Sequence, residues 1–144
     1  MKYTDGFIRV ESVIDNLGDD GLTESTERCD DTRPARIGED KEKVIALYTE
    51  EGQGGRTDTR VTISEGEITV SRTGAITSIF VYKEGEVTES LYRIGSFAFD
   101  ASIKTRKIRN NLTRPYGSVH ILYDMTVGGA KKAVRMKITL READ

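Results

Sequence analysis

Arg72 and two tyrosines are the residues whose chemistry and position point to a binding site. Ile68 and Val70 alternate with polar residues in EGEITVSR, as in a strand with one buried face, and Arg72 is next in the buried phase. The planar guanidinium of arginine suits carboxylates and phosphates, which it holds through paired hydrogen bonds. Tyr92 and Tyr123 also fall in inward phases. A cluster of Arg72, Tyr92 and Tyr123 inside the fold is therefore the candidate site for a small anionic ligand.

Two other roles for Arg72 remain open at this point. The strand ends immediately at Thr73–Gly74, so the side chain could run along the mouth of the fold and reach water, and this role is favoured. It could instead be buried beside a carboxylate, which would make its role structural. The two tyrosines could likewise be core packing.

The usual catalytic and metal-binding patterns are missing. The chain has one histidine, His120, in an outward phase, and one cysteine, Cys29, in a poorly patterned segment, so nothing pairs a nucleophile with a base. One His and one Cys cannot supply a Cys/His metal site. We expect no catalytic residues, no cofactor and no metal, and hence a binding protein rather than an enzyme.

Composition indicates one globular domain. The chain has 144 residues, of which 36% are apolar and 32% charged. It has no apolar run near the ~20 residues of a membrane-spanning helix, and MKYTDGFIRVE lacks the apolar core of a secretory signal. With Cys29 as its only cysteine, it has no intrachain disulfide. We expect a cytoplasmic protein without a membrane partner.

Strand-like runs separated by glycine-bearing turns follow one another along the chain, and helical periodicity is almost absent. Residues 16–42 are expected to be the least regular part. The runs predict strands at Gly6–Asp15, Thr23–Cys29 (weakly), Val44–Glu50, Thr57–Ser64, Glu67–Arg72, Ala75–Lys83, Val87–Ile94, Phe97–Ile108, Gly117–Val127 and Ala133–Arg141.

Short connections without helices imply antiparallel pairing of these strands. An open sheet of this length would leave exposed edges, so we predict an all-β fold: a single closed antiparallel barrel of about eight to ten strands over residues 1–144. A two-sheet sandwich is the alternative, and the strict succession of hairpins favours the barrel.

Charge is divided sharply along the chain. Residues 1–103 carry 12 Lys/Arg and 21 Asp/Glu, whereas residues 104–141 carry 10 Lys/Arg and one acid, Asp124. Acidic and basic strands could simply neutralise each other across the sheet. Alternatively, a basic outer wall could bind an acidic protein or RNA, which is the second function that the sequence suggests. Alternation places four basic residues on this outer wall: Lys104, Arg106, Arg135 and Lys137.

The same alternation predicts the inward side chains of the last three runs. They are Phe97, Phe99, Ala101 and Ile103, then Val119, Ile121, Tyr123, Met125 and Val127, then Val134, Met136, Ile138 and Leu140.

The stretches TRVTISEGEITVSRTGAITSIFVYKEG, SLYRIGSFAFDASIKTRKI and GSVHILYDMTVGG resemble the YwiB-like family of bacterial proteins of unknown function. The matching elements are Ser64–Glu67, Arg72–Gly74 and Leu122–Met125, within a resemblance that covers residues 44–141. Before Val44 the chain has ERCDDTRPARIGEDKEK where the family usually has an aromatic-rich hairpin. The resemblance implies a calycin-like, or lipocalin-like, antiparallel barrel, and it implies no activity and no catalytic residues.

Overall fold

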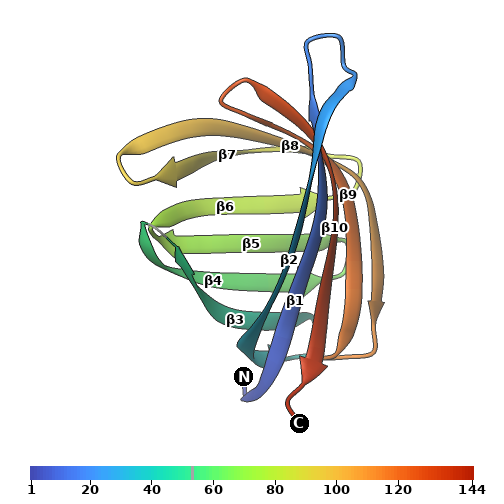
Figure 1. Ribbon diagram of the computed structural model, residues 1–144. Helices are drawn as coiled ribbons and strands as arrows, with labels where there is room; N and C mark the ends of the chain where they lie inside the picture. Colours follow the sequence, from blue (N-terminus) through green and yellow to red (C-terminus); the bar gives the residue numbers. More distant parts are fainter. Residues whose placement is uncertain (53) are drawn as a thin grey trace.

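The computed structural model describes residues 1–52 and 54–144, which form ten antiparallel strands (Figure 1). In these residues we find no helix with the length and hydropathy needed to cross a membrane. Gln53, in the turn expected from EGQGG, lies outside the described residues. The strands are β1 (Tyr3–Leu17), β2 (Thr23–Glu39), β3 (Lys43–Gly52), β4 (Gly55–Ser64), β5 (Glu67–Gly74), β6 (Ile76–Lys83), β7 (Val87–Ile94), β8 (Phe97–Leu112), β9 (Gly117–Val127) and β10 (Ala130–Glu142).

The strands close into a barrel in which each pairs with its neighbours in the chain and β1 pairs with β10. The all-β antiparallel barrel predicted from the sequence is therefore confirmed, and the sandwich is wrong. Two of the ladders are short. Strand β2 pairs with β3 only from Arg36 to Glu39, and β6 pairs with β7 only at Ile76 and Thr77. In Figure 1, β3 to β6 accordingly run across the direction of β1, β2, β9 and β10.

Residues 16–42, expected to be the least regular, contain the 17-residue strand β2. Strand β2 follows β1 from Tyr3 to Leu17, with one shift of register near Leu17. Its side chains are exposed from Thr23 to Thr32, on both phases of the strand. This part of β2 buries neither face and so has no reason to alternate polar with apolar residues, which explains the weak pattern of the predicted strand Thr23–Cys29. The strand continues beyond the predicted end to Glu39, where Ala35 and Ile37 are buried.

The barrel is filled by aliphatic and aromatic side chains from the inward phases. Val119 and Ile121 are completely buried, as predicted, and Ala101, Ile103, Tyr123, Val134, Ile138 and Leu140 are buried with them. Met125, Val127 and Met136 are only partly buried against this core.

The prediction that Phe97 and Phe99 are buried is wrong, because their exposures are 69% and 39%. Both belong to the inward phase of β8, opposite Ile94 and Tyr92 of β7. They lie at the end of the barrel where β5 finishes at Gly74 and β7 finishes at Ile94, which we call the Gly74 end. Alternation identifies the face of a strand but not its depth, and side chains at a rim have no opposite wall to cover them.

Candidate functional site

Four inward side chains form one row across β3, β4, β5 and β6, near the Gly74 end. Tyr48 pairs with Thr59, Thr59 with Arg72, and Arg72 with Ser78. Cross-strand partners on one face have Cβ atoms about 5 Å apart, so this register alone brings the four polar groups together. We call Tyr48, Thr59, Arg72 and Ser78 the inner polar row.

The next row towards the barrel centre is entirely apolar. Here the partners are Ala46, Val61, Val70 and Phe80, all buried. The inner polar row therefore lies on an apolar floor and faces the Gly74 end. An amphiphilic arrangement of this kind, with apolar walls and a few convergent polar groups, is typical of small-molecule sites.

Arg72 is the only cation of the row, and its side chain is 24% exposed. Its nearest carboxylate is that of Glu50, whose Oε1 lies 3.9 Å from Arg72 Nε, beyond hydrogen-bond reach. Glu50 Oε1 instead accepts a hydrogen bond from Thr59 Oγ1 at 3.4 Å. The structure thus combines two of the roles considered for Arg72, since it lies at a strand end with some access to solvent and beside a carboxylate.

Ser78 adds an unused hydroxyl beside Arg72. Its side chain is 2% exposed, and its Oγ has no hydrogen-bond partner within the described parts of the chain. Thr105 Oγ1 on β8 is in the same state. Buried hydroxyls are normally hydrogen-bonded, so these two have unmet hydrogen-bonding capacity.

Tyrosines surround Arg72 from both sides of the barrel. Tyr82 and Tyr123 meet edge to face, with ring centroids 4.7 Å apart. Burial raises the pKa of each of these hydroxyls, and the positive charge of Arg72 acts in the opposite direction on both. Burial likewise raises the pKa of Tyr48, where Glu50 adds to the shift and Arg72 again opposes it.

Of the residues proposed from the sequence, the structure places Tyr123 within electrostatic reach of Arg72 in the barrel interior. Tyr92 instead stacks on Phe80 of the apolar floor, with ring centroids 5.8 Å apart, and has no contact with Arg72 or Tyr123 among those found in the described residues. Sequence reasoning missed Tyr48, Thr59 and Ser78. Each lies in the inward phase of its own run, but only the register between strands shows that they adjoin Arg72.

The outer wall carries the basic residues proposed as an alternative site. Lys104, Arg106 and Arg135 are exposed and Lys137 is half-buried. Arg106 already forms an ion pair, in which its Nε donates a hydrogen bond to Asp124 Oδ2 at 2.7 Å. The register of β8 shifts between Thr105 and Lys107, so Arg106 is an extra residue in the ladder.

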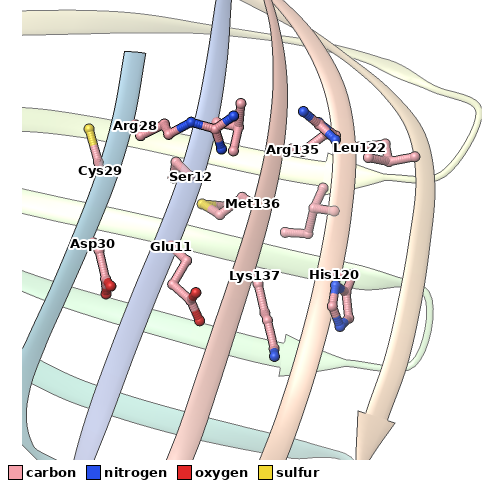
Figure 2. A pocket seen from close by; sticks show the side chains of 12 residues that line it. Glu11, Ser12, Arg28, Cys29, Asp30, His120, Leu122, Arg135, Met136 and Lys137 are labelled. Atoms are coloured by element: carbon pink, nitrogen blue, oxygen red, sulfur yellow. The ribbon is translucent and has the colours of Figure 1, made fainter. Parts of the chain in front are cut away.

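This bulge adds cations that alternation alone did not find. Beyond it, Ile108 turns inward opposite Ile121, while Lys107 and Arg109 share the outer face with Leu122 and His120. A shallow groove of about 460 Å³ crosses β2, β1, β10 and β9 on this face. In Figure 2, Asp30, Glu11, Lys137 and His120 follow one another at one level of this groove, and Arg28, Arg135 and Leu122 at the next.

The closed antiparallel barrel, with a polar row inside its mouth and a charged outer face, places the chain among the β-barrel proteins. Within this class, the chain belongs to the family described as "Domain of unknown function (DUF1934)", which residues 8–140 match.

Comparison with individual proteins agrees with this family. The chain is 34% identical over 86 residues to the "Uncharacterized beta-barrel protein YwiB" of Bacillus subtilis (strain 168), an alignment that spans 60% of this chain and 61% of that protein. The structure is similar to the crystal structure of the ywiB protein from Bacillus subtilis, with a TM-score of 0.84 and 28% identity over 99% of this chain and 94% of the other. The resemblance to the YwiB-like family is thereby confirmed.

Proposed function

We propose that the protein is a non-enzymatic binding protein that holds a small anionic molecule at the Gly74 end of its barrel. The observation that carries this proposal is the state of Arg72. Its side chain is three-quarters buried, yet none of its N–H groups is hydrogen-bonded to a described residue and the nearest carboxylate oxygen is 3.9 Å away. A guanidinium in such surroundings gains most from a planar oxyanion that can take two of its hydrogen bonds.

The neighbours of Arg72 suit such a ligand. Ser78 is its cross-strand partner, and the Ser78 hydroxyl has no hydrogen-bond partner among the described residues. Val61, Val70 and Phe80 are buried beneath the row, so they give Arg72 apolar surroundings in which an ion pair is stronger than in water. A small carboxylate or phosphate is the class of ligand that these groups suit. The free thiol of Cys29 suits a reducing compartment, so we propose a cytoplasmic ligand.

The proposal is tested first with 1-anilinonaphthalene-8-sulfonate, an aromatic anion whose fluorescence reports binding. Arg72→Met keeps an unbranched side chain of similar reach and removes the charge. Because hydrogen bonds to charged groups contribute about 1.5–3 kcal/mol, we expect this variant to bind the probe at least about tenfold more weakly. Arg72→Lys keeps the charge without the planar fork and should be intermediate.

Arg60→Met is the matched control, since Arg60 is exposed on the outer phase of the adjacent strand β4. It should bind the probe like the unchanged protein. Native mass spectrometry of protein purified under mild conditions should also find a retained small mass that Arg72→Met loses. Unchanged binding of the probe by a folded Arg72→Met variant, shown by circular dichroism, would contradict the proposal.

A further inference from the structure

One transverse row on the outer wall alternates cations with aliphatic residues over five strands. Its members, each a cross-strand partner of the next, are Lys107, Leu122, Arg135, Val13 and Arg28. Neighbouring strands lie about 4.8 Å apart, so the three cations are spaced by about 10 Å, with one aliphatic side chain between each two. Four of the five residues line the groove on this face. We call the five residues the outer row.

The cations of the outer row are available to a partner. No carboxylate of the described residues lies within 4 Å of Lys107, Arg135 or Arg28. Asp30, at the edge of the groove, is already paired with a cation outside the outer row. Arg9 donates hydrogen bonds to both of its carboxylate oxygens, at 2.9 and 2.7 Å.

The centre of the row is an exposed leucine. Leu122 is 39% exposed, between Lys107 on one side and Arg135 on the other. Strands that bind single-stranded nucleic acid offer aromatic rings for base stacking as well as positive charge. The described residues that line this groove include no Phe, Tyr or Trp. A partner with both carboxylates and aliphatic side chains would satisfy the cations and cover Leu122 together.

We propose that the outer row is a docking surface for an acidic protein segment that also carries aliphatic side chains. Charge complementarity supplies the long-range attraction, and contact with Leu122 and Val13 adds the short-range part. The outer row lies on the outer face of β8, β9, β10, β1 and β2, whereas the inner polar row lies on the inner face of β3 to β6, so the two sites are chemically and spatially separate. Failure of one proposal therefore leaves the other unaffected.

The test measures fluorescence anisotropy of three labelled probes with the full chain. They are an acidic amphipathic peptide of Glu and Leu, the same peptide with Ser at every Leu position, and a 20-nucleotide RNA. We expect the Glu/Leu peptide to bind most tightly of the three, with an affinity that falls as the salt concentration is raised. The double variant Lys107→Glu/Arg135→Glu should bind this peptide at least about tenfold more weakly, because attraction becomes repulsion. Leu122→Ser should lower the affinity for the Glu/Leu peptide and leave the affinity for the Glu/Ser peptide unchanged.

Arg60→Glu/Arg93→Glu is the control, since it makes the same change of net charge with two exposed cations outside the outer row. It should bind the Glu/Leu peptide like the unchanged protein. The proposal is overturned if this control weakens binding as much as the outer-row variant does. It is also overturned if the RNA binds more tightly than the peptide, which would assign the row to nucleic acid, or if Leu122→Ser leaves both peptides unchanged.

Discussion

Arg72 on β5 and Ser78 on β6 are direct cross-strand partners, and both side chains belong to the inner face of the barrel. One brings a guanidinium that the described side chains leave without hydrogen bonds, and the other brings a buried hydroxyl in the same state. Unmet hydrogen-bonding capacity costs stability, and the proposed anion would supply the missing hydrogen bonds.

The first prediction concerns this cost. Ser78→Ala removes a buried hydroxyl without a partner, so we expect the free energy of unfolding to rise by about 1 kcal/mol. The same change should weaken binding of the anilinonaphthalene sulfonate, since the anion loses a donor. Urea unfolding and probe titration measure the two effects. Ser71→Ala, on the outer phase of the neighbouring strand β5, should change neither, and a loss of stability in Ser78→Ala would refute the description of its hydroxyl.

The second prediction concerns Gly74, which ends the strand that carries Arg72. Its φ is +136°, and a Cβ there would lie 2.2 Å from the carbonyl oxygen of Arg56. Gly74→Ala should therefore destabilise the protein by more than the about 1–3 kcal/mol of backbone strain alone, and should lower probe affinity by displacing Arg72.

Gly66→Ala is the comparison for this variant. Gly66 has a φ of +75°, but a Cβ there meets nothing within 4 Å. Thermal unfolding should show a clearly smaller loss of stability for this variant than for Gly74→Ala. Equal losses of stability would mean that the backbone conformation, and not the contact with Arg56, determines the effect of Gly74→Ala.

The third prediction concerns the bulge in β8. Deleting Arg106 leaves Thr105 inward, Lys107 outward and Ile108 inward, which is regular alternation. Only the exposed ion pair with Asp124 is lost, so we expect a change of at most about 1 kcal/mol in urea unfolding.

Deleting Ser102 shortens the same strand by one residue at a regular position. It would turn the buried Ile103 outward and bring Lys104 inward, so we expect a loss of at least about 2–5 kcal/mol or no folding. If both deletions cost the same, the bulge has been placed at the wrong residue.

The fourth prediction concerns alkaline pH. The pKa values of Tyr48, Tyr82 and Tyr123 are raised in the folded protein, chiefly by burial. Above the usual value of 10.0 the unfolded chain therefore releases protons that the folded protein keeps, and stability falls as pH rises. The stabilisation is fully present below pH 10 and is lost progressively towards the folded pKa values.

Urea unfolding between pH 8 and pH 11 measures this loss, with a slope of about 1.4 kcal/mol per pH unit for each proton. Tyr82→Phe removes one titrating group, so its slope above pH 10 should be smaller by about one proton. A slope unchanged by Tyr82→Phe would show that Tyr82 does not titrate differently in the two states.

Much of the fold could be predicted because short-range alternation reports which face of a strand is buried. The inward phases of β9 and β10 place Val119, Ile121 and Ile138 in the core, as the structure confirms. The same signal failed in two situations. It predicted β2 only weakly, at Thr23–Cys29, where both faces meet solvent, and missed its continuation to Glu39. It also placed Phe97 inside, whereas Phe97 lies at the rim and is exposed.

The candidate sites were predictable only in part. Arg72 is conspicuous as a charged residue in an aliphatic phase, and the basic character of the C-terminal strands is plain from composition. Neither signal indicates which residues lie beside each other in space. Ser78 adjoins Arg72, and Arg28 belongs to the outer row, because of pairings between strands that cannot be predicted from the residue types.

Residue types along the chain indicate that it makes strands joined by short turns and which side chains of most strands face inward, because successive side chains of a strand point to opposite faces. Which residues meet depends on the tertiary structure. A register between strands, a one-residue bulge at Arg106 and the closure of β1 on β10 all depend on segments distant in the chain. Those long-range pairings place Tyr48, Thr59, Arg72 and Ser78 in one row inside the barrel. Outside it, they place Leu122 and Val13 among three cations that have no carboxylate partner in the described part of the chain.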